Sequence, residues 1–306
     1  MRKPCRLKII LAAATLVLAA CGKSSPPNEA KPSGADAGPA MWRISDDDSS
    51  AYLFGTFHIL PKETQWMTPA IETAMRETPI TITEVDAKSP AAQAEMARLV
   101  QELGLNPPGV TLTGLLGPTR AVRFAAITER YDLPMAMFEP MKPWLAMIAL
   151  SVAIMQKEGF DADSGAEETI LKRADEEKDE ISHLESAEYQ LRALASLSEE
   201  EILADFDASL QEYENFSRYA DRMLSAWTGG DIGALEEETL SAMRKKAPDA
   251  FRILITDRNQ NWAREIEAMM AGDEDYFIAV GAGHLIGEGS VVDLLRDRGF
   301  KVERVQ

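Results

Sequence analysis

The sequence predicts an α/β protein with a mixed central sheet flanked by helices and a large helical insertion in the middle of the chain. Short runs of apolar and β-branched residues occur near the start, between positions 41 and 84, and again near the end, between 276 and 305. Between them lies a long stretch in which apolar residues recur at helical spacing. Strands separated by helices at both ends of a chain are typical of α/β folds.

The first twenty residues have the pattern of a lipoprotein signal peptide. Basic residues up to Lys8 precede an apolar run at 9–20, which is short for a membrane span. Small residues stand before Cys21, as a lipoprotein signal peptidase requires, so we expect cleavage before Cys21 and acylation of its thiol. A core helix is the alternative, but the run lacks polar residues at helical spacing. We expect a membrane anchor, and Gly22 in place of an aspartate favours the outer membrane, facing the periplasm.

Charge and cysteine content exclude several classes of function. Cleavage would remove four basic residues and no acidic one, which takes the net charge from −18 to −22. Nucleic acid is therefore not an expected partner. Cys5 would leave with the signal peptide and Cys21 would be acylated, so no thiol remains for a cysteine protease or a cysteine-based zinc site.

A spacer and then a folded domain are expected after the lipidated cysteine. Residues 21–40 are rich in Ser, Pro, Gly and Ala, which is typical of a disordered linker. The domain is expected to span 41–306, opening with a hairpin formed by 41–44 and 51–55 around an acidic turn. A helix at 69–77 and a buried strand at 79–84, which ends at a carboxylate, follow.

The middle of the chain is predicted to be mostly helical. Expected helices cover 90–103, 119–131, 143–155, 166–176 and several further segments between 187 and 270. Two short strands are expected among them, at 135–138 and 180–184. The chain is expected to end with a buried strand at 276–280, a helix at 289–298 and a last strand at 300–305.

Two of the three histidines stand in the same frame, glycine followed three positions later by histidine. They are His58 in Gly55-Thr56-Phe57-His58 and His284 in Gly281-Ala282-Gly283-His284, and each frame follows an apolar strand. Glycine at a strand end lets the backbone turn sharply and leaves room for a ligand. If the two strands are neighbours, the imidazoles come together beyond their carboxyl ends.

A carboxylate completes a candidate metal site. Glu84 and Asp86 follow the third strand at a spacing of two, so one of them can join the histidines. Two imidazoles and a carboxylate commonly hold a divalent metal that activates water, which predicts hydrolysis. The alternative is that each histidine is a packed polar residue and each carboxylate caps the following helix. His183 lacks the glycine frame and is expected to be an ordinary strand residue, and neither G-x-S-x-G nor H-E-x-x-H occurs.

At these residues the chain resembles the TraB/GumN family, which is related to the TIKI-type metal-dependent peptidases. The similarity lies in Gly55-Thr56-Phe57-His58, Glu84-Val85-Asp86 and Gly281-Ala282-Gly283-His284. Further landmarks are Lys142-Pro143-Trp144, Leu184-Glu185 with Glu188 and Gln190, Trp227 with Gly230-Asp231, and Arg258-Asn259 with Trp262. The resemblance covers residues 41–305.

The resemblance implies a single α/β domain with a helical insertion and a site lined by His58, Glu84 and His284. Arg258 is a further candidate, either as a donor to an oxyanion or substrate carboxylate or as a partner in a salt bridge. Glu185 or Asp86 is a candidate general base. The implied metal is manganese or cobalt rather than zinc, which suits a site without sulfur. The tryptophans are expected to be core anchors.

Two classes of function therefore remain open. The first is a metal-dependent hydrolase that acts on a peptide or protein. The second is an envelope module that binds a signalling peptide or an assembly partner without chemistry, with participation in polysaccharide export as a weaker variant. A shared fold does not decide between them.

Overall fold

The computed structural model describes residues 38–306, and every side chain among them except that of Asp205. The predicted signal peptide, Cys21 and the spacer up to residue 37 lie outside the described residues. Gly38 and Pro39 are buried, so the folded body includes residues ahead of the predicted start at Met41.

A six-stranded mixed sheet forms one half of the molecule, in the order β6-β4-β7-β2-β1-β8. Strands β6, β4, β7 and β2 are parallel, whereas β1 pairs antiparallel with β2 and with β8. The strands are β1 (Met41–Ser45), β2 (Ser50–Thr56), β4 (Ile80–Val85), β6 (Glu180–Glu185), β7 (Tyr276–Gly281) and β8 (Lys301–Arg304). A separate pair joins β3 (Leu60–Pro61) to β5 (Phe160–Asp161). The predicted fold class and the opening hairpin are confirmed.

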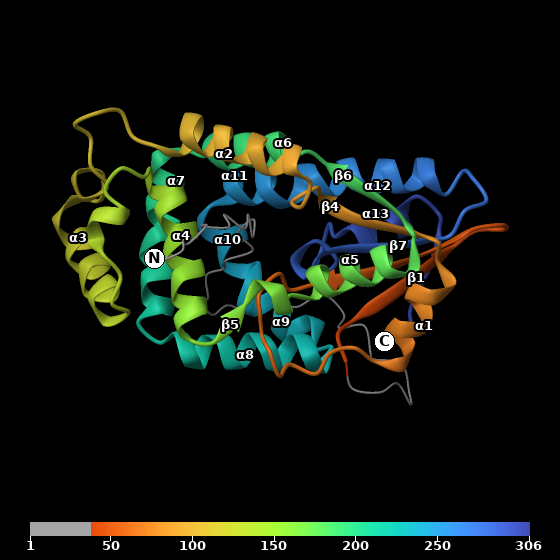
Figure 1. Ribbon diagram of the computed structural model, residues 1–306. Helices are drawn as coiled ribbons and strands as arrows, with labels where there is room; N and C mark the ends of the chain where they lie inside the picture. The colour runs from red at the N-terminus through yellow and green to blue at the C-terminus, as the bar shows by residue number, and fades with distance from the viewer. Residues whose placement is uncertain (1–37) are drawn as a thin grey trace, which may run out of the picture.

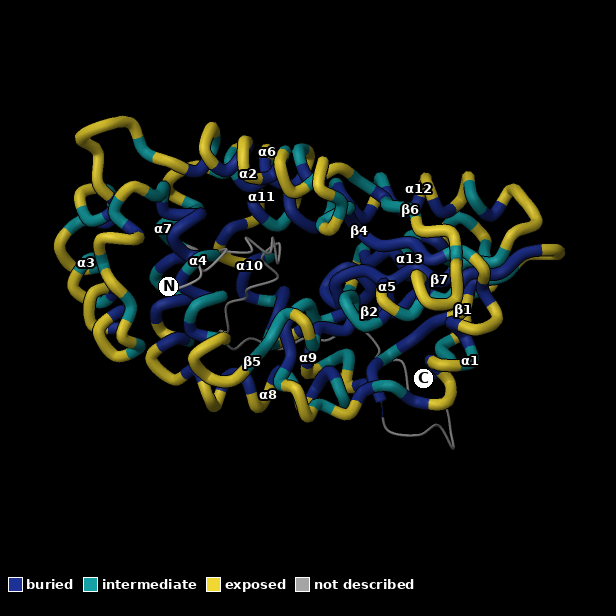
Figure 2. The backbone as a smooth tube through the Cα atoms, in the orientation of Figure 1, coloured by how far each residue is buried: buried dark blue, intermediate teal, exposed yellow. Residues whose placement is uncertain are grey.

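The centre of the sheet is buried on both faces. Leu53 in β2, Ile82 in β4 and Ile278 in β7 are each at most 1% exposed. Near-continuous apolar runs of this kind are characteristic of parallel strands covered by helices. In Figure 2 the central strands are accordingly dark blue, while the outer turns of α2 and α3 are yellow.

The helices begin where the sequence supplies caps. Side chains of Thr68, Ser89, Thr111, Ser186, Ser198, Asp231 and Ser290 each accept a hydrogen bond from the first turn of a helix. Proline occupies the first position of α1, α2 and α4, where its missing N–H costs nothing. The helices before β6 are α1 (Pro69–Glu77), α2 (Pro90–Gly104), α3 (Leu112–Arg130), α4 (Pro143–Lys157) and α5 (Ala166–Glu177).

The later helices complete the insertion and cover the sheet. They are α6 (Ala187–Ala195), α7 (Glu199–Tyr213), α8 (Phe216–Gly229), α9 (Ile232–Thr239), α10 (Ser241–Lys246), α11 (Pro248–Phe251), α12 (Asp257–Met269) and α13 (Val291–Asp297). Single turns lie at Met135–Met137, Ala162–Ser164 and Ala282–His284, and a π-helical turn spans Arg252–Thr256 between α11 and α12. Among residues 38–306, no helix combines the length and the apolar character needed to cross a membrane.

Two predicted segments differ from the structure. Residues 135–138 form a 3-10 turn instead of a strand, with Met137 N donating to Pro134 O and Phe138 N to Met135 O. Phe138 packs edge-on against Phe124 of α3, so its burial comes from a helix and not from a sheet. Helix α3 also begins earlier than predicted, because Thr111 caps a first turn that precedes a break at Gly117 and Pro118.

The arrangement of the two halves places the carboxyl ends of the parallel strands against the insertion. In Figure 1 the sheet lies at the right of the view and α3, α4, α7 and α8 lie at the left. Strands β4 and β6 run towards the insertion and lead into α2 and α6. Helix α5 packs against β4, β6 and β7.

Candidate active site

Four neighbouring parallel strands end at one edge, and each brings a predicted site residue there. The register pairs Gly55 of β2 with Val280 of β7 and Val85 of β4 with Glu185 of β6. His58 and His284 follow the ends of β2 and β7, while Glu84 and Glu185 lie at the ends of β4 and β6. Ligands of open α/β sheets bind at this edge.

The two glycine-to-histidine turns are in direct contact. A Cβ atom on Gly55 would lie 2.9 Å from Cα of Ala282, so only glycine allows the turns to approach this closely. Trp227 fixes the first turn, because its Nε1 donates to the carbonyl of Gly55 over 2.8 Å and its ring stacks on Phe57. Trp227 is 2% exposed, as expected of a core anchor, and it also positions the site.

Glu84 is a buried carboxylate with every oxygen engaged. It is 4% exposed, and Oε1 accepts from the backbone N–H of Gly281 over 2.6 Å. Oε2 accepts from Nη2 of Arg258 over 2.7 Å and from Nε2 of Gln190 over 3.2 Å. Burial alone would raise the pKa of Glu84, but Arg258 and the two site histidines lower it to about 2. Glu84 is therefore ionised at neutral pH.

Arg258 of α12 lies at the centre of the site. It is 5% exposed, and its guanidinium bridges Glu84 and Glu185, with Nε 3.0 Å and Nη2 2.5 Å from Oε1 of Glu185. Nη1 donates to the carbonyl of Leu254 over 3.2 Å, and the guanidinium carbon lies 4.7 Å from the ring centroid of Trp262. Burial lowers the pKa of Arg258, but the carboxylates of Glu84 and Glu185 raise it by more than burial lowers it. The guanidinium is therefore permanently charged.

His284 is neutral, and its hydrogen bonds define its tautomer. Nε2 lies 2.9 Å from Nη1 of Arg258, and Nδ1 lies 2.6 Å from Oδ1 of Asn259. Because arginine can only donate, Nε2 accepts and Nδ1 carries the proton. The amide of Asn259 is oriented by its own donation to the carbonyl of Gly289. Burial and the charge of Arg258 lower the pKa of His284 to about 3.

His58 lies at the more exposed rim of the site, where its Nδ1 is 3.2 Å from Oε2 of Glu167. Burial lowers the pKa of His58, but the carboxylates of Glu167 and Glu84 raise it to about 9. Gly165 places Glu167, since a Cβ at position 165 would lie 2.1 Å from the carbonyl oxygen of His58. Ala166 N also donates to the carbonyl of Phe57. The start of α5 is therefore docked onto the first histidine turn.

We define the site cluster as His58, Glu84, Glu185, Arg258 and His284. The structure brings these five predicted residues together, and it adds Glu167, Gln190 and Asn259 as partners that the sequence analysis did not assign to the site. Gln190 and Asn259 had been noted only as landmarks of the resemblance. The acidic first turn of α5 and the glycine before it are the only signals that pointed to Glu167, and neither specifies a contact with His58.

Two other candidates have structural roles. Oδ1 of Asp86 accepts from the backbone N–H groups of Lys88 and Ser89, both over 2.9 Å, in the turn before α2. His183 of β6 pairs through Nδ1 with the hydroxyl of Thr83 over 2.8 Å. Asp86 therefore fits the capping alternative, and His183 is the ordinary strand residue that was expected.

The donor types of His58, Glu84 and His284 suit a divalent metal, which is commonly held by imidazole and carboxylate groups. In the part of the chain that the structure describes, no three His, Cys, Asp or Glu side chains are grouped closely enough to hold a metal ion. The single lone pair of Nε2 of His284 already accepts from Arg258. The trio would thus fit a metal only if Arg258 released His284 and His58 gave up its proton.

Comparison with known proteins identifies relatives of this domain. The model of the TraB/PrgY/gumN family matches residues 40–304. An uncharacterised protein of Escherichia coli K12, YbaP, is 26% identical over 170 residues, which are 56% of this chain and 62% of that protein. The metalloprotease TIKI1 of Danio rerio is 22% identical over 333 residues, covering 90% of this chain and 66% of that protein. The match therefore spans less than two thirds of each relative, and no solved structure matches the chain.

Proposed function

The chain belongs to the TraB/PrgY/gumN family, and from the site cluster we propose that it is a hydrolase that cleaves peptide bonds. The observation that supports this most strongly is a permanently charged, buried Arg258 held at the carboxyl edge of four parallel strands. Relatives named as metalloproteases support the same reaction class at the level of the family.

Arg258 is proposed to stabilise the oxyanion that forms when water attacks a carbonyl. Glu84 and Glu185 hold its planar donors in place, and all five N–H groups already donate within the site. The oxyanion would therefore take the Nη1 donor that His284 now accepts, which is the same release that frees His284 for a metal. Glu84 keeps Arg258 in place and balances its charge.

Glu185 is the proposed proton carrier. Glu185 lines a groove of about 460 Å³ together with Tyr189 and Trp262, whereas Glu84 does not line it. We therefore assign Glu185 as general base, in preference to Asp86. Glu185 would take a proton from the attacking water and pass it to the leaving amine. His58 is protonated at neutral pH because its pKa is raised to about 9, and it would have to lose that proton before it could bind a metal.

The proposed ligands of a divalent metal are His58, Glu84 and His284. Manganese or cobalt is proposed in preference to zinc. A bound metal would polarise the carbonyl and lower the pKa of a bound water. Asn259 would then hold the ring of His284 in the tautomer that directs Nε2 towards the metal, as it does towards Arg258 in the structure.

We further propose that the domain works at the periplasmic face of the outer membrane, anchored by a lipid on Cys21. Its substrate would then be a peptide or protein of the envelope. A nucleic acid is not proposed as a partner, because the chain carries a net charge of −18.

The experiment compares the purified protein with His58→Ala, His284→Ala and the control His183→Ala. Metal content, thermal stability with and without chelation, and hydrolysis of a peptide library are measured for each. We expect bound metal and hydrolysis to fall in the first two variants and to persist in His183→Ala. A metal that stabilises the native protein raises its unfolding temperature. Equal metal content and equal activity in all four proteins would contradict the proposal.

One observation favours a second candidate, a binding module without chemistry. Glu84, Arg258 and His284 satisfy one another's hydrogen bonds, as expected of a structural polar network. In that case the histidine variants would lower stability without changing metal content, and the library would yield no product.

A further inference from the structure

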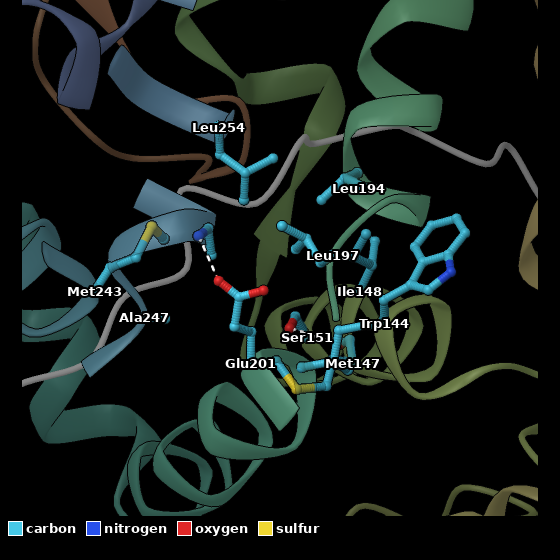
Figure 3. A pocket seen from close by; sticks show the side chains of 12 residues that line it. Trp144, Met147, Ile148, Ser151, Leu194, Leu197, Glu201, Met243, Ala247 and Leu254 are labelled. Carbon is cyan, nitrogen blue, oxygen red and sulfur yellow. Dashed lines mark hydrogen bonds between the residues drawn. The ribbon is translucent and has the colours of Figure 1, made fainter. Parts of the chain in front are cut away.

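An apolar cavity of about 50 Å³ lies in the helical insertion, between α4, α6, α7, α10 and the turns that precede α12. Its walls include Trp144, Ile148, Leu194, Leu197, Met243 and Leu254. Figure 3 shows these side chains arranged around a common space.

The carboxylate of Glu201 and the hydroxyl of Ser151, which line the cavity, are already engaged. Glu201 accepts from the backbone N–H of Ala250 over 2.7 Å, the bond dashed in Figure 3, and from the hydroxyl of Ser198 over 2.6 Å. Ser151 donates to the carbonyl of Met147 and pairs with the hydroxyl of Tyr213. The ring nitrogen of Trp144 has no hydrogen-bond partner among the described residues, but Figure 3 shows it on the side of the indole away from the other lining side chains, so it does not face the cavity. The cavity therefore suits an apolar group, since a polar one would lose its hydrogen bonds there.

The cavity lies one helical turn from the site cluster along two separate segments. On α6, Gln190 donates to Glu84 and Leu194 lines the cavity four residues later. In the π-helical turn, Leu254 lines the cavity, and its carbonyl accepts from Arg258 four residues later. Four helical residues rise about 6 Å. An extended peptide advances about 3.3–3.6 Å per residue, so a side chain in the cavity belongs within two residues of a peptide bond at Arg258.

We propose that this cavity is a specificity subsite for one aliphatic side chain of the substrate, such as Leu, Ile, Val or Met. The proposal rests on the proposed peptidase function and names the class of peptide that it cleaves. One water-sized group needs about 10–15 Å³ of such a cavity, so about 50 Å³ accommodates three or four carbon atoms. That space matches an aliphatic side chain and excludes an indole.

The test changes the size of the cavity without touching the site cluster. Leu197→Ala enlarges it and Ala247→Met fills it, while Leu103→Ala on α2 is a matched control of similar burial outside the lining. Peptides that vary at one position near the cleaved bond are supplied to each protein. We expect the wild type to prefer Leu over Ala and over Trp, by about tenfold or more for each. Leu197→Ala should shift the preference towards Phe and Trp, Ala247→Met towards Ala, and Leu103→Ala should leave it unchanged.

A binding measurement separates failure of this proposal from failure of the peptidase function. N-acetyl-leucine amide should raise the unfolding temperature of the wild type, while N-acetyl-aspartate amide should not, and Ala247→Met should lose the effect. The wild type could hydrolyse peptides without preferring any side chain, or with a preference that neither Leu197→Ala nor Ala247→Met changes. Either result would overturn the subsite and leave the peptidase function standing. Stabilisation by the leucine amide without hydrolysis of any peptide would instead overturn the peptidase function, and with it the assignment of the cavity as a substrate subsite.

Discussion

Nη1 of Arg258 donates to Nε2 of His284 over 2.9 Å, so the nitrogen that we propose as a metal ligand accepts a hydrogen bond from an arginine. The same guanidinium contacts Glu84 and Glu185, which places a fixed positive charge among the predicted metal ligands and the candidate base. Arg258 therefore balances the charges of Glu84 and Glu185. A metal that bound to Nε2 of His284 would have to displace Arg258 from that nitrogen.

The first prediction concerns the loss of that charge. Arg258→Gln leaves the buried Glu84 and the side chain of Glu185, which is 7% exposed, without a counter-charge, and we expect the free energy of unfolding to fall by about 3–5 kcal/mol. Chemical denaturation measures the change. Arg264→Gln, on the exposed side of the same helix, is the control and should stay within about 0.5 kcal/mol of the wild type.

Coupling between the partners gives a sharper version of this test. Glu84→Gln in the Arg258→Gln background removes a charge that has already lost its partner, so the two effects should not add. A double variant that is destabilised by the full sum of the single changes would show that the pair acts as two independent residues.

The second prediction is a stability maximum near pH 6.5 in the chelated protein. The folded-state pKa of His58 is raised from 6.5 to about 9, so its contribution is complete below pH 6.5 and is lost as the pH rises through 9. The folded-state pKa of His284 is lowered from 6.5 to about 3, so its contribution is complete above pH 6.5 and is lost as the pH falls towards 3. Glu84 acts in the same direction as His284, between about pH 4.5 and 2.

Each limb of that profile can be assigned by substitution. Each proton changes stability by about 1.4 kcal/mol per pH unit while it titrates in one state only. His58→Gln should flatten the alkaline limb and His284→Gln the acid limb, measured as free energies of unfolding between about pH 5 and pH 9. A stability that keeps rising from pH 6.5 to 9 in the wild type would contradict the raised pKa of His58.

Much of the sheet and the core of the site could be predicted, because both depend on local pattern. Glycine before each histidine, and apolar strands before each glycine, were sufficient to bring His58 and His284 to one edge. The contact between Glu167 and His58 could not be predicted, because it depends on how the start of α5 docks across the sheet. Residues 135–138 were mistaken for a strand because a four-residue apolar run has no period that separates a strand from a buried turn.

The third prediction tests the anchor, which lies outside the described residues. Cys21→Ser removes the thiol that would be acylated, so we expect the protein to move from the membrane fraction to the soluble fraction. Immunoblotting of fractionated cells checks this, with Cys5→Ser as the control, because Cys5 would be removed with the signal peptide. A Cys21→Ser protein that stays with the membrane would show that something other than a lipid on this cysteine holds it there.

The last prediction concerns Gly165, where α5 meets the first histidine turn. A methyl group there would lie 2.1 Å from the carbonyl oxygen of His58, which is backbone and cannot rotate away. Gly165→Ala must therefore push α5 off the turn, and we expect a loss of about 3 kcal/mol in the free energy of unfolding. Gly229→Ala is the matched control, because no atom lies within 4 Å of a Cβ at that position.

A second measurement on these glycine variants separates general destabilisation from a change at the site. Moving α5 also moves Glu167, so the pKa of His58 should fall from about 9 towards its ordinary value. With three histidines in the chain, an NMR titration can follow each imidazole separately. If Gly165→Ala lowers stability while the pKa of His58 stays near 9, then the position of Glu167 does not control His58. In that case the proton on His58 would be held by Glu84, and Glu84→Gln, not the glycine variant, should lower the pKa of His58.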